Sequence, residues 1–292
     1  MRVQRYEDAA TFLSRAQDVL RAEPVTTTVI GTVAARAAAH PSPVASGTPQ
    51  WWATVEDGPH VVGLAMRAAP WSPFPLHVGP MPEPAAAALA DALLAEQPTV
   101  TEVNGGRGAA LAVAAGLASA SASSIETAMH LRLHELADLE VPADPPGRCR
   151  LATVADGDVV LDWYERFHAE ADEQAGRPPD PNPPHFAPGE LEARIDDGLM
   201  SLWVLDDLPV HLTAWNSPAH GVVRVGPVFT PREHRGRGYA AAAVARVSAA
   251  ALEAGHRAVL LTDQANPTSN ALYERLGYRP VTDMVNLRIV AN

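Results

Sequence analysis

Alternating and continuous apolar runs in the second half of the chain predict strands, and small apolar residues at helical spacing predict helices between them. The expected elements are strands at 209–215 and 222–229, a helix at 239–254, a strand at 258–262, a short helix at 268–276 and a last strand at 284–290. Gly255 and Gly277 stand at the ends of the two helices, where a glycine commonly stops helical structure. A further helix is expected to begin earlier, at about Gly157.

The first half of the chain repeats this order. It predicts strands at 60–66 and 76–80, a helix at 84–96, a strand at 100–103, a short helix at 111–117 and a strand at 128–133. The tripeptide Val-Gly-Pro also recurs at the same point, at 78–80 and at 225–227. The element order, the spacing and the shared tripeptide together favour two copies of one α/β unit. The alternative is that this element order is common and that the tripeptide agrees by chance.

A proline-rich segment divides the two copies. Residues 141–148 hold three prolines and a glycine, which stop regular structure. We therefore expect one domain over residues 1–140, a linker over 141–148 and a second domain over 149–292, each of ordinary domain size.

Composition narrows the class of protein. With 292 residues, 47% of them hydrophobic and 19% charged, the chain is typical of a globular protein. Its net charge of -12 argues against nucleic-acid binding, which needs many basic phosphate contacts. All 22 basic residues are arginine, so a lysine nucleophile is excluded. Cys149 is the single cysteine, which excludes an internal disulfide and a multi-cysteine metal site.

Targeting signals are the next question. The N-terminus shows no apolar signal core, and no apolar run reaches the roughly 18 residues of a membrane span. A cytoplasmic protein without a membrane partner is the expectation.

A glycine-rich turn at 230–240 connects a predicted strand to a predicted helix. The first N–H groups of a helix lack backbone partners and carry the positive end of the helix dipole, which suits an anion. Gly236 and Gly238 let a phosphate approach the backbone, and Arg235 and Arg237 supply charged donors. No Walker-type loop or Rossmann fingerprint is present. The alternative interpretation is a solvated arginine-rich turn.

The segment 266–278 gives a second signal. It reads as a capped short helix, with Asn266 as the N-cap, Pro267 at the first helical position and Gly277 just past the end. Tyr273 lies within this helix, and taken alone it would be interpreted as a core aromatic residue.

Taken together, the two signals resemble the GNAT superfamily of acyl-CoA N-acyltransferases. The turn matches the pyrophosphate-binding motif of that family at Arg235, Gly238 and Ala240, and the short helix matches its second cofactor motif at Asn266, Ser269, Leu272 and Tyr273. The resemblance covers about residues 149–292, and the first half follows only in element order. It implies an α/β (α+β) fold of two tandem GNAT-like domains. Each would be a mixed, mostly antiparallel sheet flanked by helices, with a splayed pair of parallel strands.

In this family acyl-CoA lies in the gap between the splayed strands. The resemblance places the cofactor-binding strand at 225–230, with a bulge at Gly226-Pro227 because proline cannot donate a ladder hydrogen bond. The backbone N–H groups of residues 237–240 would take the pyrophosphate. The implied cofactor-binding residues are Val228, Phe229, Thr230, Arg235, Gly236, Arg237, Gly238, Tyr239, Ala240, Asn266, Asn270 and Tyr273.

The implied reaction is direct attack of a neutral amine on the thioester. Tyr273 stands where the family keeps a tyrosine that hydrogen-bonds or protonates the leaving thiolate, and it is the main catalytic candidate. His211 and Glu170 are the candidates for a general base, which this family does not hold at a fixed position and sometimes replaces by water. The alternative interpretation of His211 is a packed or solvated side chain without a catalytic role. The alternative interpretation of Glu170, and of its neighbour Glu173, is a solvated acidic helix face.

The first half departs from the family at the phosphate turn. Residues 81–85 contain no glycine pair and no arginine, and Glu83 would repel a pyrophosphate. The glycine-rich segment 104–108 falls at a different connection and is expected to be a turn. One cofactor per chain is therefore expected, with a degenerate first copy that shapes the acceptor cleft or supports a homodimer.

The predicted function is an acetyl-CoA-dependent N-acetyltransferase with an amine acceptor, a small molecule more than a protein. A non-catalytic CoA-binding sensor or scaffold is the alternative. A metal hydrolase has little support because the histidines are scattered and no His-Glu-x-x-His pattern occurs, so no metal is expected. The sequence leaves the acceptor, the acyl chain length and the oligomeric state open.

Overall fold

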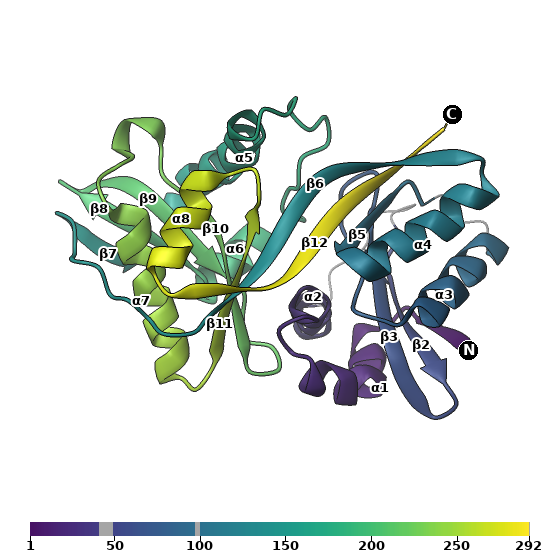
Figure 1. Ribbon diagram of the computed structural model, residues 1–292. Coiled ribbons are helices and arrows are strands. Elements are labelled where there is room, and N and C mark those ends of the chain that lie inside the picture. Colours follow the sequence, from purple (N-terminus) through teal and green to yellow (C-terminus); the bar gives the residue numbers. More distant parts are fainter. Residues whose placement is uncertain (41–48, 97–99, 292) are drawn as a thin grey trace. The chain divides into compact units, whose positions relative to one another are not determined.

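The computed structural model describes residues 1–40, 49–96 and 100–291, and the chain forms two compact units (Figure 1). The first unit contains Met1–Leu133 and the C-terminal segment from Val281, and the second contains His134–Pro280. Each unit holds a mixed, mostly antiparallel sheet flanked by helices, and each sheet contains one parallel strand pair. The predicted fold class is confirmed.

The sheet of the second unit runs in the order β11-β10-β9-β8-β7. Its strands are β7 (Arg148–Leu151), β8 (Met200–Leu205), β9 (Leu208–Trp215), β10 (Val222–Phe229) and β11 (Arg257–Asp263), and its helices are α5 (Gly157–Gln174), α6 (Glu190–Asp196), α7 (Tyr239–Glu253) and α8 (Pro267–Arg275). Neighbouring residues of β8 face opposite sides of the sheet. Leu202 packs with Trp163 of α5, and Trp203 packs with Ala242 of α7, so the two helices cover opposite faces.

The parallel pair of the second unit separates at a bulge. The ladder between β10 and β11 runs from Val222↔Arg257 to Val225↔Leu260. On its other edge β10 changes register against β9 between Val225 and Val228, which confirms the bulge predicted at Gly226-Pro227. Past this point the described ladder of β10 continues with β9 and not with β11, so the backbone of β10 faces the gap toward β11.

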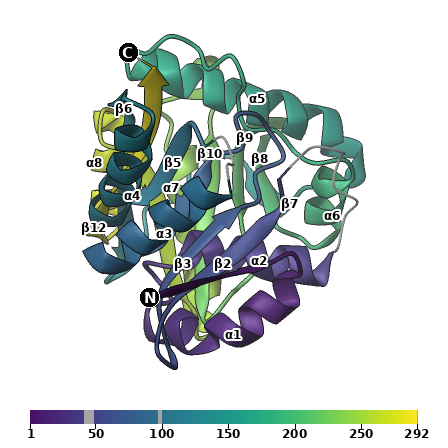
Figure 2. The same cartoon turned by 90° about the vertical axis from the view of Figure 1, so that its right-hand side faces the viewer.

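The first unit repeats the arrangement. Its strands are β1 (Arg2–Tyr6), β2 (Trp51–Asp57), β3 (His60–Arg67), β4 (Leu76–Val78) and β5 (Glu102–Gly106), and its helices are α1 (Ala9–Ala22), α2 (Thr28–Ala39), α3 (Glu83–Ala95) and α4 (Arg107–Ala120). Strands β4 and β5 are parallel, as β10 and β11 are. Alternation along β2 places Trp51 against α3 and α4 and Trp52 against α1 and α2, and Figure 2 shows these two helix pairs.

Two long strands belong to both units. Strand β6 (Ser123–Leu136) passes from the first unit into the second after Leu133, and β12 (Tyr278–Ala291) passes from the second into the first after Pro280. Strand β12 pairs antiparallel with β5, from Met284↔Gly106 to Arg288↔Glu102. The last strand of the chain therefore completes the sheet of the first unit, and the segment 141–148 lies within the second.

The turn predicted at 104–108 is wrong. Asn104, Gly105 and Gly106 form the end of β5, and Arg107 begins α4 directly. Gly105 has a φ of 145°, and a Cβ there would stand 2.1 Å from the carbonyl oxygen of Val78. The glycine is needed because strand β4 passes too close for a side chain, which sequence reading interpreted as a turn signal.

Candidate active site

The turn before α7 is shaped by two glycines in left-handed backbone conformations. Gly236 has a φ of 74° and Gly238 a φ of 87°. Beside Gly236 an added Cβ would meet nothing within 4 Å, and beside Gly238 it would meet only Pro145, at 3.9 Å. The turn is therefore open on the side where the glycines lack side chains, and a large anion has room to approach the backbone.

Helix α7 begins immediately after this turn. The N–H of Ala242 donates to the carbonyl oxygen of Gly238 at 3.1 Å, which closes the first helical turn. The N–H groups that precede Ala242 in the helix have no helical carbonyl to reach, and they carry the positive end of the dipole. The side chain of Tyr239 is buried against Trp203, so Tyr239 presents only its backbone at this site.

The corresponding helix start in the first unit has a different chemistry. At α3 the N–H groups of Ala85 and Ala86 both donate to the carbonyl oxygen of Pro82, at 2.9 and 3.1 Å. Pro84 has no N–H, and the carboxylate of Glu83 lies in the first turn. Few donors and a negative charge make this end of α3 unsuited to a phosphate.

The residues of the cofactor strand lie beyond the bulge. Val228 pairs with Thr213 and Phe229 with Leu212 on the β9 side. Phe229 is buried against Trp163 at 6.1 Å between ring centroids. The side chain of Phe229 thus anchors the strand in the core while its backbone lies at the gap.

Helix α8 follows β11 on the other side of the gap. The Oδ1 of Asn266 accepts the N–H of Ser269 at 3.1 Å, which confirms Asn266 as the N-cap. The Nδ2 of Asn270 donates to the carbonyl oxygens of Asp263 and Asn266, at 3.1 and 2.9 Å. Both asparagines therefore fix the loop that connects β11 to α8.

Tyr273 is buried in the core of the second unit. Its ring packs edge-on against Tyr278 at 6.0 Å, and burial raises the pKa of its hydroxyl well above the ordinary value. Among the described residues its hydroxyl has no hydrogen-bond partner, whereas the hydroxyl of Tyr278 is paired with Ser248 at 2.7 Å. Tyr273 is thus a core residue whose hydroxyl stays protonated at pH 7.

His211 is completely buried on β9. Its Nδ1 lies 2.7 Å from the Oγ1 of Thr230, and its Nε2 lies 2.6 Å from the Oγ1 of Thr213. Burial lowers the pKa of the imidazole to about 3, so the ring is neutral at pH 7. Both nitrogens are engaged, which favours a packed histidine that connects β9 to the end of β10.

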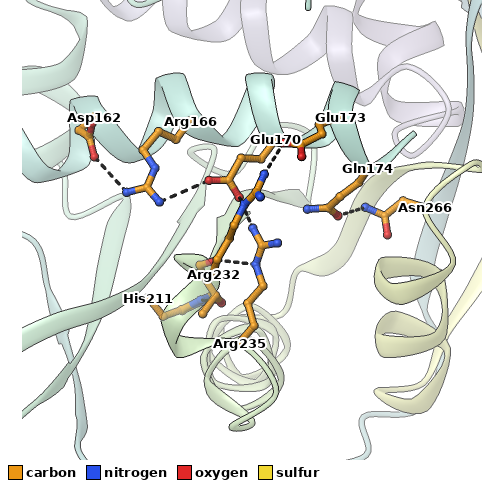
Figure 3. A network of polar contacts seen from close by, with 10 residues as sticks. Asp162, Arg166, Glu170, Glu173, Gln174, His211, Arg232, Arg235 and Asn266 are labelled. Carbon is orange, nitrogen blue, oxygen red and sulfur yellow. Dashed lines mark hydrogen bonds and ion pairs between the residues drawn. The ribbon is translucent and has the colours of Figure 1, made fainter. Parts of the chain in front are cut away.

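Glu170 lies at the centre of a charged network between α5 and the glycine-rich turn (Figure 3). Its Oε1 accepts from Arg166 at 3.3 Å, and its Oε2 accepts from Arg232 at 3.4 Å and from Arg235. Its side chain is only 12% exposed, so it does not belong to a solvated acidic face. Of these partners only Arg235 was singled out from the sequence.

Two further residues extend this network. Glu173 accepts a hydrogen bond from Arg232, and the Oε1 of Gln174 accepts from the Nδ2 of Asn266 at 3.0 Å. Sequence reading missed Arg232 and Gln174, although the polar residues 166, 170, 173 and 174 recur at the three- and four-residue spacing of one helix face.

Two further features are absent from the part of the chain that the structure describes. No helix there is both long and apolar enough to cross a bilayer. Residues 1–40, 49–96 and 100–291 also contain no group of three or more histidine, cysteine, aspartate or glutamate side chains that could hold a metal ion.

Comparisons with known proteins place the fold. Residues 204–287 match the sequence model of the FR47-like protein family. A search of curated proteins finds no match.

Several solved structures resemble the chain over nearly its whole length. A tandem GNAT protein from the clavulanic acid biosynthesis pathway has a TM-score of 0.60 and 14% identity, covering 100% of this chain and 99% of its own. A GCN5-related N-acetyltransferase from Sphaerobacter thermophilus has a TM-score of 0.56 and 16% identity, covering 99% and 96%. One from Kribbella flavida has a TM-score of 0.53 and 20% identity, covering 93% and 96%. The chain therefore has the fold of these GNAT structures.

Proposed function

We propose that this protein is an acyl-CoA-dependent N-acyltransferase that transfers an acetyl group from acetyl-CoA to a primary amine. The observation that carries the proposal is the start of α7. A helix N-terminus with Gly236, Gly238 and Arg235 follows directly on a strand that has separated from its parallel neighbour. This combination offers an anion site at the mouth of a gap in the sheet.

The residues present fit coenzyme A. The backbone N–H groups of residues 237–240 and the guanidinium of Arg235 would hold the pyrophosphate. The backbone of Val228, Phe229 and Thr230 would hold the pantetheine arm, because this edge of β10 faces the gap. Asn266 and Asn270 would fix the loop at the opposite edge. Bound acetyl-CoA supplies the activated thioester.

In the transfer, the amine nitrogen forms a bond to the acyl carbon, the carbon–sulfur bond breaks, and the thiolate leaves. Tyr273 would donate a hydrogen bond and then a proton to that thiolate. Its raised pKa keeps the hydroxyl protonated, and its lack of a partner among the described residues leaves the hydrogen available.

The amine must also lose a proton. Glu170 and His211 are the proposed bases, with water as the alternative. Burial lowers the pKa of His211 to about 3 and leaves it a weak base at pH 7, and the carboxylate of Glu170 is already bonded to Arg166, Arg232 and Arg235, so neither candidate is favoured over water. The acidic side chains on α5 suit an acceptor that arrives as a cation.

A turnover assay tests the proposal. Acetyl-CoA is offered with a panel of diamines, amino sugars and amino acid amides, and thiol release is followed against an amine-free reaction. Amine-dependent release with formation of the acetylated amine is the expected result. Binding of acetyl-CoA without turnover on any amine would favour a CoA-binding sensor or scaffold instead.

A further inference from the structure

The C-terminal half of α5 is bonded to both sides of the gap between β10 and β11. Its polar residues Glu170, Glu173 and Gln174 share one helix face, and Arg177 follows just after the helix end. We call these four residues the α5 clasp. All its contacts described below lie within the second unit.

The first set of contacts reaches the turn after β10. Glu170 accepts hydrogen bonds from Arg235 and Arg232, and Glu173 accepts one from Arg232 (Figure 3). Arg235 also donates from Nε to the carbonyl oxygen of Thr230 at 2.9 Å, which orients its guanidinium within the turn. The α5 clasp therefore holds the arginine that belongs to the pyrophosphate motif.

The second set of contacts reaches the loop after β11. Gln174 accepts from the Nδ2 of Asn266 at 3.0 Å. Arg177 pairs with Asp263 at 2.5 Å and with Asp172 at 3.1 Å. One turn of α5 separates Glu170 from Gln174, so a single helix end holds one residue from each of the two cofactor motifs, Arg235 and Asn266.

We propose that the α5 clasp is a gate for the cofactor, in which Glu170 and the pyrophosphate of coenzyme A compete for Arg235. This inference rests on the proposed function. If the guanidinium of Arg235 turns to the pyrophosphate, it gives up its bond to Glu170. The carboxylate of Glu170 and the pyrophosphate, both negative and both next to Arg235, then repel each other. Cofactor binding then loosens the end of α5 from the turn, and the cofactor binds more weakly than the anion site alone would allow.

The charge change can be isolated with two matched variants. Glu170→Gln removes the competing carboxylate, and Glu165→Gln removes the same charge from an exposed residue of the same helix. Isothermal titration with CoA should show Glu170→Gln binding roughly 5- to 10-fold more tightly than wild type, a ratio typical of one hydrogen bond. Glu165→Gln should bind as wild type does.

The alternatives give different results. Equal affinity in wild type and both variants would overturn the gate and leave the proposed function standing. Weaker binding by Glu170→Gln would also overturn it, because the carboxylate would then assist the cofactor. If neither wild type nor the two variants bind CoA, both the proposed function and the gate are wrong.

A measurement without ligand tests the clasp itself. Hydrogen exchange at the backbone amides of residues 170–177 should be several-fold faster in Glu170→Gln than in Glu165→Gln, because one set of contacts is lost. Addition of CoA to wild type should accelerate exchange in the same segment. Unchanged exchange in Glu170→Gln would show that Glu170 does not hold the helix end, and would overturn the inference whatever the protein catalyses.

Discussion

At the scale of single residues, burial separates two side chains that the sequence presents as catalytic candidates, Tyr273 as the main one and His211 as a general base. Tyr273 and His211 are both buried, but burial acts on them differently. It raises the pKa of the tyrosine, so the hydroxyl remains a donor, and it lowers the pKa of the histidine, so the ring becomes a poor base. Their partners differ too, since both nitrogens of His211 are bonded.

Tyr273→Phe should lower turnover by about 10²-fold or more, the usual contribution of a positioned acid, while the affinity for acetyl-CoA stays nearly the same. The hydroxyl has no partner among the described residues, so its removal should change the free energy of unfolding little. Steady-state kinetics and titration calorimetry measure the two effects. Tyr278→Phe, which loses the bond to Ser248 instead, is the control and should keep its turnover. Unchanged turnover in Tyr273→Phe would remove this residue from the mechanism.

The buried histidines predict a pH dependence of stability. The pKa of His211 is about 3 in the folded protein and that of His168 about 4, both lowered mainly by burial, against about 6.5 in the unfolded chain. The unfolded state therefore binds more protons between these values, and the free energy of unfolding should fall as the pH drops below 6.5. The slope is up to about 1.4 kcal/mol per pH unit for each group.

Urea unfolding at pH 7.5, 6.5, 5.5 and 4.5 measures this dependence. His211→Asn should be less stable at pH 7.5 and should show a shallower slope between pH 6.5 and 4.5, because one titrating group is gone. The exposed His185→Asn serves as the control and should keep the wild-type slope. An identical slope in His211→Asn would mean that His211 is not buried in its neutral form.

At the scale of elements, the two helices that follow the parallel strands differ at their first turn. Helix α7 begins after two open glycines, and α3 begins at Pro82, Glu83 and Pro84. The same strand–turn–helix connection therefore offers N–H donors in the second unit, and few donors with a negative charge in the first. Both units keep the connection from a strand to the following helix, but the three or four residues at the start of that helix decide whether it can bind an anion.

Gly238→Asp tests the turn of α7. Titration with CoA should show more than a ten-fold loss of affinity, because a carboxylate would stand where the pyrophosphate binds. Gly238→Ala is the matched variant, since it imposes the same strain at a φ of 87° without a charge, and it should lose much less. Equal losses in the two variants would mean that backbone strain and not charge determines the effect.

At the scale of the whole molecule, the C-terminal strand builds the first unit. Val285 and Leu287 of β12 are buried in the core formed by β2, β4, α3 and α4. Leu287 is paired with Val103 of β5. The first unit therefore depends on residues that follow the second unit in the chain, and residues 1–140 do not complete its sheet.

Leu287→Ala should lower the free energy of unfolding of the first unit by about 2–5 kcal/mol, as for other fully buried leucines. Hydrogen exchange should accelerate at the amides of β5 and β2, with a smaller change at β8 and β9. The exposed Val281→Ala on the same strand is the control. Acceleration confined to β8 and β9 would contradict the assignment of β12 to the first unit.

The difference between α7 and α3 also predicts the binding stoichiometry. Titration of wild type with acetyl-CoA should give one site per chain, because the start of α3 lacks the donors that an anion needs. Glu83→Gln should leave the value at one, since Pro84 still offers no N–H. A stoichiometry of two in wild type would show that the first unit keeps a site of its own.

The sequence alone determined the repeated element order, the glycine turn, the capped helix and the bulge at Gly226-Pro227. These features are local, and glycine, proline and asparagine report backbone conformation over a few neighbouring residues. Only the tertiary structure decided that β12 completes the first unit, that Gly105 serves strand packing, that His211 is buried and that Glu170 holds Arg235. Alternation predicts which face of a strand is buried but not its partner, and pairing between residues 65 positions apart depends on how the elements pack.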